Sequence, residues 1–320
     1  MGLITRFRFL KGCLFIILSA VIYGCMPLMA KYIYADGVNS FTLVFLRNFL
    51  ALPSLAILAF VQQKTLRVPL KLLPSVSLIA LLGCCITPVL LFSSYLFIAS
   101  GTATVFHFVY PALVVLGGIL FFRDRPSAGN LFCVLLCAAG VFLFYTPGES
   151  FHWQGSLLAL SSGATFAAYI LLLSRFDKNK LSGFLFSFVI AGISSIAMFV
   201  LCICTGQLAL PSTLLGWGLC FLFANAVTTG AVVLFQQGTF LIGGQRASIL
   251  STLEPITSIF LGVLVFHEPL TLRVTLGSCL VIAASVLTAV FDLLKMKGDH
   301  HGKNSDRKRN HQRNPSPARG

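Results

Sequence analysis

Long apolar stretches, separated by short polar or charged turns, run along the chain from residue 12 to residue 294. Most are close to the roughly 20 residues that an α-helix needs to cross the hydrocarbon core of a bilayer. The stretches are continuous rather than alternating, which excludes a porin-like barrel, because barrel strands alternate apolar and polar positions. The pattern predicts ten membrane-spanning helices, at approximately residues 12–34, 41–62, 73–98, 102–122, 128–146, 154–174, 181–204, 213–240, 246–266 and 272–294.

The chain also contains an internal repeat, and internal repeats dictate architecture. Residues 102–144 align without a gap on residues 246–288, so that Pro111 falls on Pro255. A weaker match, in which Gly12 falls on Gly155, extends the repeat upstream. The repeat predicts two five-helix units and a tail, at residues 1–147, 148–295 and 296–320.

An odd number of spans in the first unit makes the second unit enter the membrane from the opposite side, so we expect two inverted repeats. Lysines and arginines test this topology. With a cytoplasmic N-terminus, the outer loops hold only Lys31 and Arg273, whereas the inner segments hold the tail and Arg6, Arg8, Lys11, Lys64, Arg67, Lys71, Arg123, Arg125, Arg175, Lys178, Lys180 and Arg246. This positive-inside asymmetry predicts a multi-pass protein of the plasma (inner) membrane with both termini in the cytoplasm.

Composition supports an all-α integral membrane protein. Hydrophobic residues make up 57% of the chain and charged residues 10%, whereas soluble domains carry about 25% charged residues. The net charge of +14 is then mainly an orientation signal, so nucleic-acid binding is not expected. The tail from Lys303 to Gly320 is polar and basic, and we expect it to be disordered. The alternative for this tail is a polybasic segment held near anionic lipids.

The ten cysteines all lie inside apolar stretches and form no CxxC pair. They are best interpreted as small buried hydrophobes, so no metal or redox cofactor is predicted. The sequence contains neither an HExxH motif nor a Walker A motif. ATP hydrolysis by this chain is therefore not indicated.

Two segments carry a family resemblance, namely TATVFHFVYPALVVLGGILFFRDRPSAGNLFCVLLCAAGVFLF and RASILSTLEPITSIFLGVLVFHEPLTLRVTLGSCLVIAASVLTA. They resemble the two repeats of the EamA family, within the drug/metabolite transporter superfamily. The shared pattern includes a mid-helix proline and an acidic turn, at Asp124 and Glu268, and Asp124 departs from the usual glutamate. The Glu254-Pro255 pair and Arg47 fit the pattern as well.

The resemblance covers almost the whole chain to about residue 295 and says little about the substrate. It implies a ten-helix protein with a cavity between inverted halves, which is usually an exporter of small metabolites.

Three ionisable groups lie away from the ends of the predicted spans, namely Arg47, His107 and Glu254. Such groups cost at least a few kcal/mol at mid-membrane, so they usually face a cavity or a partner. Glu254 lies about 12 Å into its span at 1.5 Å per residue, and we favour a cavity-lining role over a structural carboxyl. His107 fits a cavity and a packing or snorkelling role equally well. For Arg47 we favour a structural role in which it snorkels to the outer surface, and the alternative is binding of an anionic group.

The repeat places His107 on Ser251 and Tyr110 on Glu254, so these positions are expected to meet between the halves. Further polar candidates lie in mid-span, at Tyr23, Thr87, Thr165, Tyr169, Asn225, Thr228 and Thr229. The apolar majority, including thirty phenylalanines, is assigned to lipid contact and packing. The predicted substrate-binding set is Glu254, His107, Tyr110, Tyr23, Thr165, Tyr169, Asn225 and Arg47.

The leading hypothesis is a secondary transporter that moves a small organic metabolite, amino-acid-like or drug-like, by alternating access. Efflux is the favoured direction, and proton coupling through Glu254 is left open. A membrane-embedded enzyme would need an acid dyad, a metal-spaced cluster or an activated nucleophile, and the sequence offers no such pattern. A non-transporting scaffold is the third alternative. The expected partners are a small solute and membrane lipid, and the sequence leaves a homodimer open.

Overall fold

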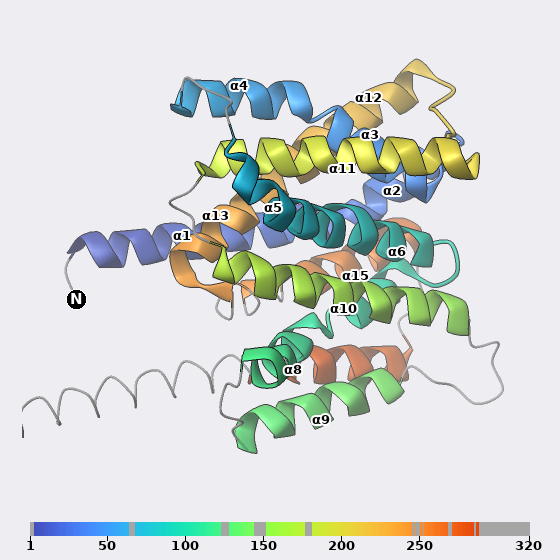
Figure 1. Ribbon diagram of the computed structural model, residues 1–320. Coiled ribbons are helices and arrows are strands. Elements are labelled where there is room, and N and C mark those ends of the chain that lie inside the picture. Colours follow the sequence, from blue (N-terminus) through green and yellow to red (C-terminus); the bar gives the residue numbers. More distant parts are fainter. Residues whose placement is uncertain are drawn as a thin grey trace, which may run out of the picture.

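A computed structural model describes residues 3–63, 68–122, 128–143, 152–176, 181–244, 247, 250–251, 253–267, 271–284 and 286–287. All regular structure in this part of the chain is helical, and the helices pack in one bundle (Figure 1). The elements are α1 (Leu3–Gly24), α2 (Met26–Ala35), α3 (Ser40–Phe49), α4 (Leu52–Gln63), η1 (Leu70–Leu72), α5 (Leu73–Ala80), η2 (Leu81–Ile86), α6 (Thr87–Ser94), α7 (Ser100–His107), α8 (Tyr110–Phe122), α9 (Ala128–Phe142), α10 (Trp153–Arg175), α11 (Gly183–Thr205), α12 (Leu214–Phe223), η3 (Ala224–Val232), α13 (Val233–Ile242) and α15 (Leu253–Phe266).

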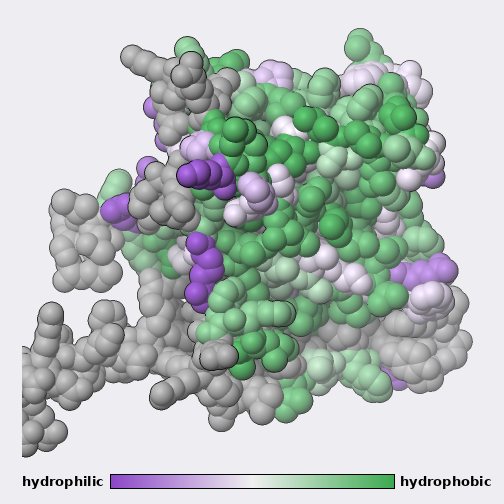
Figure 2. Space-filling model, viewed as in Figure 1, coloured by the Kyte–Doolittle hydropathy of each residue, from purple (hydrophilic) through white to green (hydrophobic). Residues whose placement is uncertain are grey.

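Among the described residues, seven helical stretches are long and apolar enough to cross a membrane. Hydrophobic side chains cover most of the visible flank of the bundle, as a lipid-facing surface requires (Figure 2). The predicted fifth, ninth and tenth spans correspond to shorter helices, namely α9, α15 and Leu272–Ala284. The all-helical membrane fold is therefore confirmed, and the count of ten spans stays a prediction.

Prolines divide several of the predicted spans into two helices. Pro27, Pro53 and Pro111 each occupy the second position of a helix, in α2, α4 and α8, directly after a break. Proline lacks a backbone N–H and its ring clashes with the preceding turn, so it is tolerated in a first turn but interrupts a longer helix. The spans predicted at 12–34, 41–62 and 102–122 correspond to the candidate membrane spans Phe7–Ala35, Ser40–Gln62 and Ser100–Phe122, each of which the proline divides into two helices. By contrast α10 and α11, which contain no proline, are unbroken.

The two overlong predicted spans, the third and the eighth, each contain a π-helical segment, η2 and η3. The register that places Gly12 on Gly155 also places Leu81, the first residue of η2, on Ala224, the first residue of η3. Pro88 is the second residue of α6, which follows η2 directly. Such π-helical insertions are rare and concentrate at functional sites, so the matching positions draw attention to the interior between these helices.

The repeat-equivalent helices α1 and α10 run in opposite directions (Figure 1). A Cβ on Gly12 of α1 would meet Leu241 and Ile242 at the end of α13, and Ser174, near the end of α10, lies beside Gly244. The first half of α1 and the end of α10 therefore both lie near the end of α13. The inversion of the complete units stays a prediction, and the boundary near residue 147 lies outside the described residues, as do the tail at 296–320 and the acidic turns.

Candidate functional site

A small buried cavity lies where residues from both halves of the chain meet. Its volume is about 30 Å³, which is room for about two water molecules. The residues that line it are Tyr23, Met26, Arg47, Gly83, Thr87, Pro88, Leu91, His107, Phe166 and Glu254. The three ionisable groups singled out in the sequence, together with Tyr23, therefore come together at one cavity.

Glu254 occupies the first turn of α15, directly after a turn in which its N–H donates to the Ser251 carbonyl over 2.9 Å. The free N–H groups and the dipole of a helix N-terminus favour a negative charge there. Its side chain is 4% exposed and makes no hydrogen bond or ion pair with any residue that the structure describes. Gly24 on α1 packs against the Glu254 carbonyl, where an added Cβ would lie 2.9 Å from the oxygen.

Arg47 lies on α3 and is also 4% exposed, so it does not snorkel to the surface as we favoured from the sequence. Its guanidinium carbon lies 5.8 Å from the ring centroid of Phe92. The Nε atom is buried and has no hydrogen-bond partner in the described part of the chain. Tyr23 lines the same cavity as Arg47 and Glu254.

His107 is the last residue of α7 and is oriented by a hydrogen bond, because its Nδ1 lies 2.8 Å from the Ser162 Oγ. The Ser162 hydroxyl donates its hydrogen to the Ala159 carbonyl over 2.6 Å. The Oγ must therefore accept from His107, and Nδ1 carries the proton. In a neutral imidazole, Nε2 is then a hydrogen-bond acceptor.

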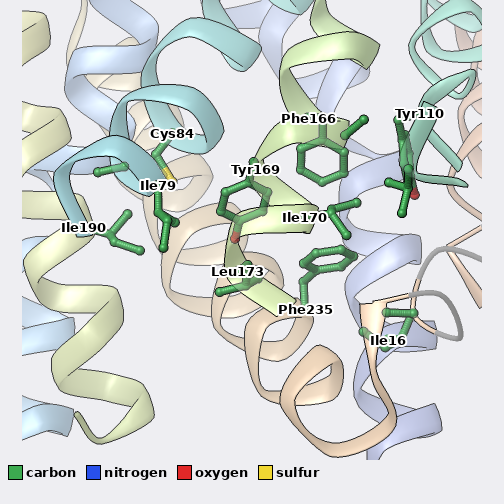
Figure 3. Packing of buried hydrophobic residues seen from close by; sticks show 14 of the residues in the cluster. Ile16, Ile79, Cys84, Tyr110, Phe166, Tyr169, Ile170, Leu173, Ile190 and Phe235 are labelled. Atoms are coloured by element: carbon green, nitrogen blue, oxygen red, sulfur yellow. The ribbon is translucent and has the colours of Figure 1, made fainter. Parts of the chain in front are cut away.

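Phe166 of α10 forms an aromatic wall of the cavity. Its ring centroid lies 4.8 Å from that of Tyr110, 5.2 Å from that of His107, 5.4 Å from that of Tyr169 and 5.7 Å from that of Phe235. Figure 3 shows Phe166, Tyr169 and Phe235 packed together, with Tyr110 on the far side of Phe166. Phe166 thus packs among other rings, as expected for the phenylalanines, and it lines the cavity as well.

The other predicted site residues differ in their distance from the cavity. Thr165 shares a hydrogen bond of 2.7 Å with the cavity-lining Thr87, and the Tyr169 hydroxyl accepts a 3.3 Å hydrogen bond from Gln236. Asn225 lies apart, because its Oδ1 accepts from Ser54 of α4 over 2.6 Å and it is only half-buried. Tyr110, Thr165 and Tyr169 thus surround the cavity, and Asn225 does not.

Sequence reasoning missed the apolar lining residues, namely Met26, Gly83, Pro88, Leu91 and Phe166. It also missed Ser162, which orients His107, and Gln236, which holds Tyr169. The available signal was the repeat: Ser162 falls opposite Ser19, and Ser19 donates to the Ala231 carbonyl across the two halves.

No metal centre is evident in the residues described. They contain no group of three His, Cys, Asp or Glu side chains that could hold a metal ion. A second cavity, of about 380 Å³, has an almost entirely apolar lining, contributed by Ile256, Ile259, Phe260, Val263, Leu264, Thr275, Ser278, Cys279 and Ile282. Such a lining suits a hydrocarbon chain rather than a polar solute.

Comparisons with known proteins agree with a transporter. The EamA-like transporter family is matched twice, at residues 10–146 and 153–290. An uncharacterized transporter of Archaeoglobus fulgidus is 25% identical over 276 residues, which are 85% of this chain and 94% of the relative. The uncharacterized inner membrane transporter YicL of Salmonella typhimurium is 26% identical over 294 residues, 88% of this chain and 95% of the relative. A protein of known crystal structure, with 15% sequence identity, resembles this chain with a TM-score of 0.60. The match covers 88% of this chain and 96% of the other chain, and at this identity the similarity concerns the fold alone.

Proposed function

Because the chain belongs to the EamA-like transporter family, we propose that it is a secondary transporter that moves a small organic metabolite, amino-acid-like or drug-like, across the membrane. The observation that carries this proposal is the buried cavity, to which both halves contribute and at which Arg47, His107 and Glu254 meet. Buried ionisable groups at membrane depth mark substrate or ion pathways. A scaffold would have no need of such a cavity.

Alternating access is the mechanism that this geometry supports. A cavity of about 30 Å³ is too small for an organic solute, so the solute must enter by an opening of the bundle. Breaks at repeat-equivalent places adjoin the cavity, after His107 in one half and at Ser251 in the other. Transporters with inverted repeats bind their substrates at broken helices near the repeat interface. The opposite directions of α1 and α10 support two inverted five-helix units, at residues 1–147 and 148–295.

The positions of basic residues support a cytoplasmic N-terminus. Arg8, Lys11, Lys71 and Arg175 lie near the start of α1, the start of α5 and the end of α10, which share one end of the bundle (Figure 1). The positive-inside rule assigns such an end to the cytoplasm. Efflux is proposed as the direction because it is the usual one in the family that this chain resembles.

The test is a transport assay in proteoliposomes that contain the purified protein. A mixture of metabolites is supplied with and without a pH gradient, and the lumen is analysed by mass spectrometry. We expect saturable transport of at least one small solute, and a dependence on the gradient if Glu254 carries the coupling proton. Protein that is folded and inserted but moves nothing in the mixture would support the scaffold alternative.

Glu254→Gln tests the coupling, because it keeps the shape and the hydrogen-bonding capacity of the side chain and removes its titration. We expect the variant to insert normally. The rate of gradient-driven transport should fall at least about ten-fold, which corresponds to a change of roughly 1.4 kcal/mol in free energy. Glu149→Gln, which removes a carboxylate outside the predicted spans, is the matched control. Transport at the wild-type rate with unchanged pH dependence would make Glu254 a structural residue.

A further inference from the structure

We propose that the apolar groove between α15 and the helix Leu272–Ala284 binds one acyl chain of an anionic phospholipid, whose phosphate group lies at the outer end of the groove. The groove is the apolar cavity of about 380 Å³ described above. It shares no lining residue with the cavity between the two halves. The proposal therefore concerns a second site and does not depend on which solute the protein transports.

The first observation is that the groove opens on the flank of the bundle. Ile256, Phe260 and Leu264 follow one another along its α15 wall, and their side chains are 46%, 63% and 60% exposed. A continuous exposed apolar surface of this kind marks a site that contacts a membrane or another apolar partner. In a membrane protein, the acyl chains of the bilayer are what such a surface meets first.

The second observation is that the hydroxyl groups of the lining already donate their hydrogens within their own helix. The Thr275 hydroxyl donates to the Thr271 carbonyl over 3.0 Å, and the Ser278 hydroxyl donates to the Val274 carbonyl over 2.7 Å. The weak Cys279 thiol is the one other polar group of the lining. A polar occupant would lose its hydrogen bonds to water without an adequate replacement, whereas a hydrocarbon chain has none to lose.

The third observation is the width of the groove, which distinguishes a hydrocarbon chain from a helix. Leu264 lies eight residues after Ile256, so the groove is about 12 Å long at 1.5 Å per residue. A volume of about 380 Å³ over this length leaves a width of roughly 6 Å. An α-helix with its side chains is about 10–12 Å across. A helix of a partner or of a second copy is therefore too wide for the groove, and a single acyl chain is not.

The fourth observation is the positive charge at one end of the groove. Lys31 and Arg273 are the only lysine and arginine of the predicted outer segments. The Lys31 ammonium lies 4.1 Å from the centroid of the Phe266 ring, two residues after Leu264. Arg273 is exposed, lies two residues before Thr275, and forms no ion pair with a residue that the structure describes.

A phospholipid accounts for both charges. The positive-inside rule explains basic residues on the cytoplasmic side, so it does not explain Lys31 and Arg273. A phosphate at the level of the outer headgroups does, because arginine binds phosphate in a bidentate geometry. An acyl chain in the groove and an anionic headgroup at its charged end together describe an anionic phospholipid.

Titration of the wild-type protein with lipids tests the proposal. Delipidated protein in detergent receives dioleoyl phosphatidylglycerol, its lyso form with one chain, dioleoyl phosphatidylcholine or glycerol phosphate. Thermal stabilisation and native mass spectrometry report binding. We expect both phosphatidylglycerols to saturate one site, phosphatidylcholine to bind at least ten-fold more weakly, and glycerol phosphate not to bind.

Three results of this titration would overturn the proposal. Equal binding of the two dioleoyl lipids would exclude a site for an anionic headgroup, and binding of glycerol phosphate would exclude a need for the acyl chain. A dimer that carries no lipid in native mass spectrometry would show that a second copy covers the groove. None of these results bears on the transport of a solute, which the proteoliposome assay measures separately.

Variants of the groove then locate the lipid. Cys279→Phe fills the groove with a ring, so the affinity for phosphatidylglycerol should fall at least ten-fold. Cys204→Phe makes the same change at another exposed cysteine, outside the groove, and is the matched control. Folded Cys279→Phe protein that binds phosphatidylglycerol like wild type would show that the chain lies elsewhere.

A variant of the charged end tests the headgroup contact. Arg273→Gln should bring the affinity for phosphatidylglycerol close to that for phosphatidylcholine. Arg8→Gln, at an exposed arginine near the start of α1, is the matched control and should keep the full preference. An unchanged preference for phosphatidylglycerol in Arg273→Gln would overturn the placement of the phosphate.

Discussion

At the scale of single residues, the position of His107 depends on a glycine in another helix. A Cβ added to Gly163 of α10 would lie 2.5 Å from the His107 carbonyl oxygen, closer than real Cβ atoms come to their neighbours. The last turn of α7 therefore lies directly against the α10 backbone. The same approach lets the Ser162 hydroxyl reach the imidazole. The side chain at the cavity is thus placed by a backbone contact that only glycine permits.

Gly163→Ala should consequently destabilise the protein and disturb the cavity. Overpacking of this kind costs roughly 1–3 kcal/mol, so we expect a lower melting temperature in detergent and weaker solute binding. Gly218→Ala is the matched control, because it lies within α12 and an added Cβ has nothing within 4 Å. Replacement of glycine by alanine in a helix interior gains up to about 1 kcal/mol. Equal melting temperatures and binding in the two variants would contradict the proposed contact.

The charged residues of the site were the ones that sequence could find. Arg47, His107 and Glu254 stand out because ionisable groups are rare and costly in apolar spans. The burial of Arg47 was not predictable, because it depends on tertiary packing, including that of the Phe92 ring. Phe166 was missed because one phenylalanine among thirty carries no local signal. Its role follows only from the rings that surround it.

At the scale of elements, prolines made most helix breaks foreseeable, whereas the π-helical segments were not. Both η2 and η3 lie within the two overlong predicted spans, and the excess length of a span does not predict where a π-helical segment falls. The wider hydrogen-bonding pattern is instead supported by neighbouring helices. Asn48 Nδ2 donates to the Cys84 carbonyl over 3.2 Å, and Ser194 Oγ donates to the Ala80 carbonyl over 3.4 Å. Such tertiary hydrogen bonds leave no local sequence pattern.

The start of α12 offers a prediction at the same scale. The Thr213 hydroxyl donates to Asp36 over 2.8 Å, and the N–H groups of Thr213 and Ser212 donate over 3.2 and 3.0 Å. These hydrogen bonds, with the Thr213 hydroxyl contributing most, hold the pKa of Asp36 below its ordinary value. A carboxyl with a lowered folded-state pKa stabilises the fold above its unfolded pKa and loses that contribution as the pH falls through the folded value.

Asp36→Asn should therefore lower the melting temperature at pH 7. The decrease relative to wild type should be smaller in acid. The difference from wild type should shrink as the pH falls below about 4, the ordinary pKa of aspartate. Melting curves between pH 3 and 7 check this, with Asp306→Asn in the predicted tail as the control. A difference that stays constant over this range would show that the Asp36 charge does not support α12.

At the scale of the whole molecule, one end of the bundle is held by contacts between the two halves. Besides the hydrogen bonds to Asp36, the Gln207 carbonyl accepts from Asn39 over 2.6 Å and from Thr42 over 2.9 Å. These bonds join Asn39, directly before α3, and Thr42, in the first turn of α3, to the segment between α11 and α12. In an alternating-access cycle this end must separate when the cavity opens towards it, so the hydrogen bonds should break and re-form in each cycle.

A disulfide across these contacts should therefore stop transport. The Ser212 hydroxyl lies 3.0 Å from the Asp36 backbone oxygen, so Asp36→Cys and Ser212→Cys place two thiols close together. The exposed Cys204 and Cys279 are first replaced by serine to avoid other pairings. Oxidation should reduce transport in proteoliposomes at least ten-fold, and a reductant should restore it, because both halves must move apart for the solute to pass.

The single-cysteine variants should not respond to oxidation. Complete cross-linking, verified by mass spectrometry, with undiminished transport would show that the solute passes without separation of this end, which is incompatible with alternating access through the cavity.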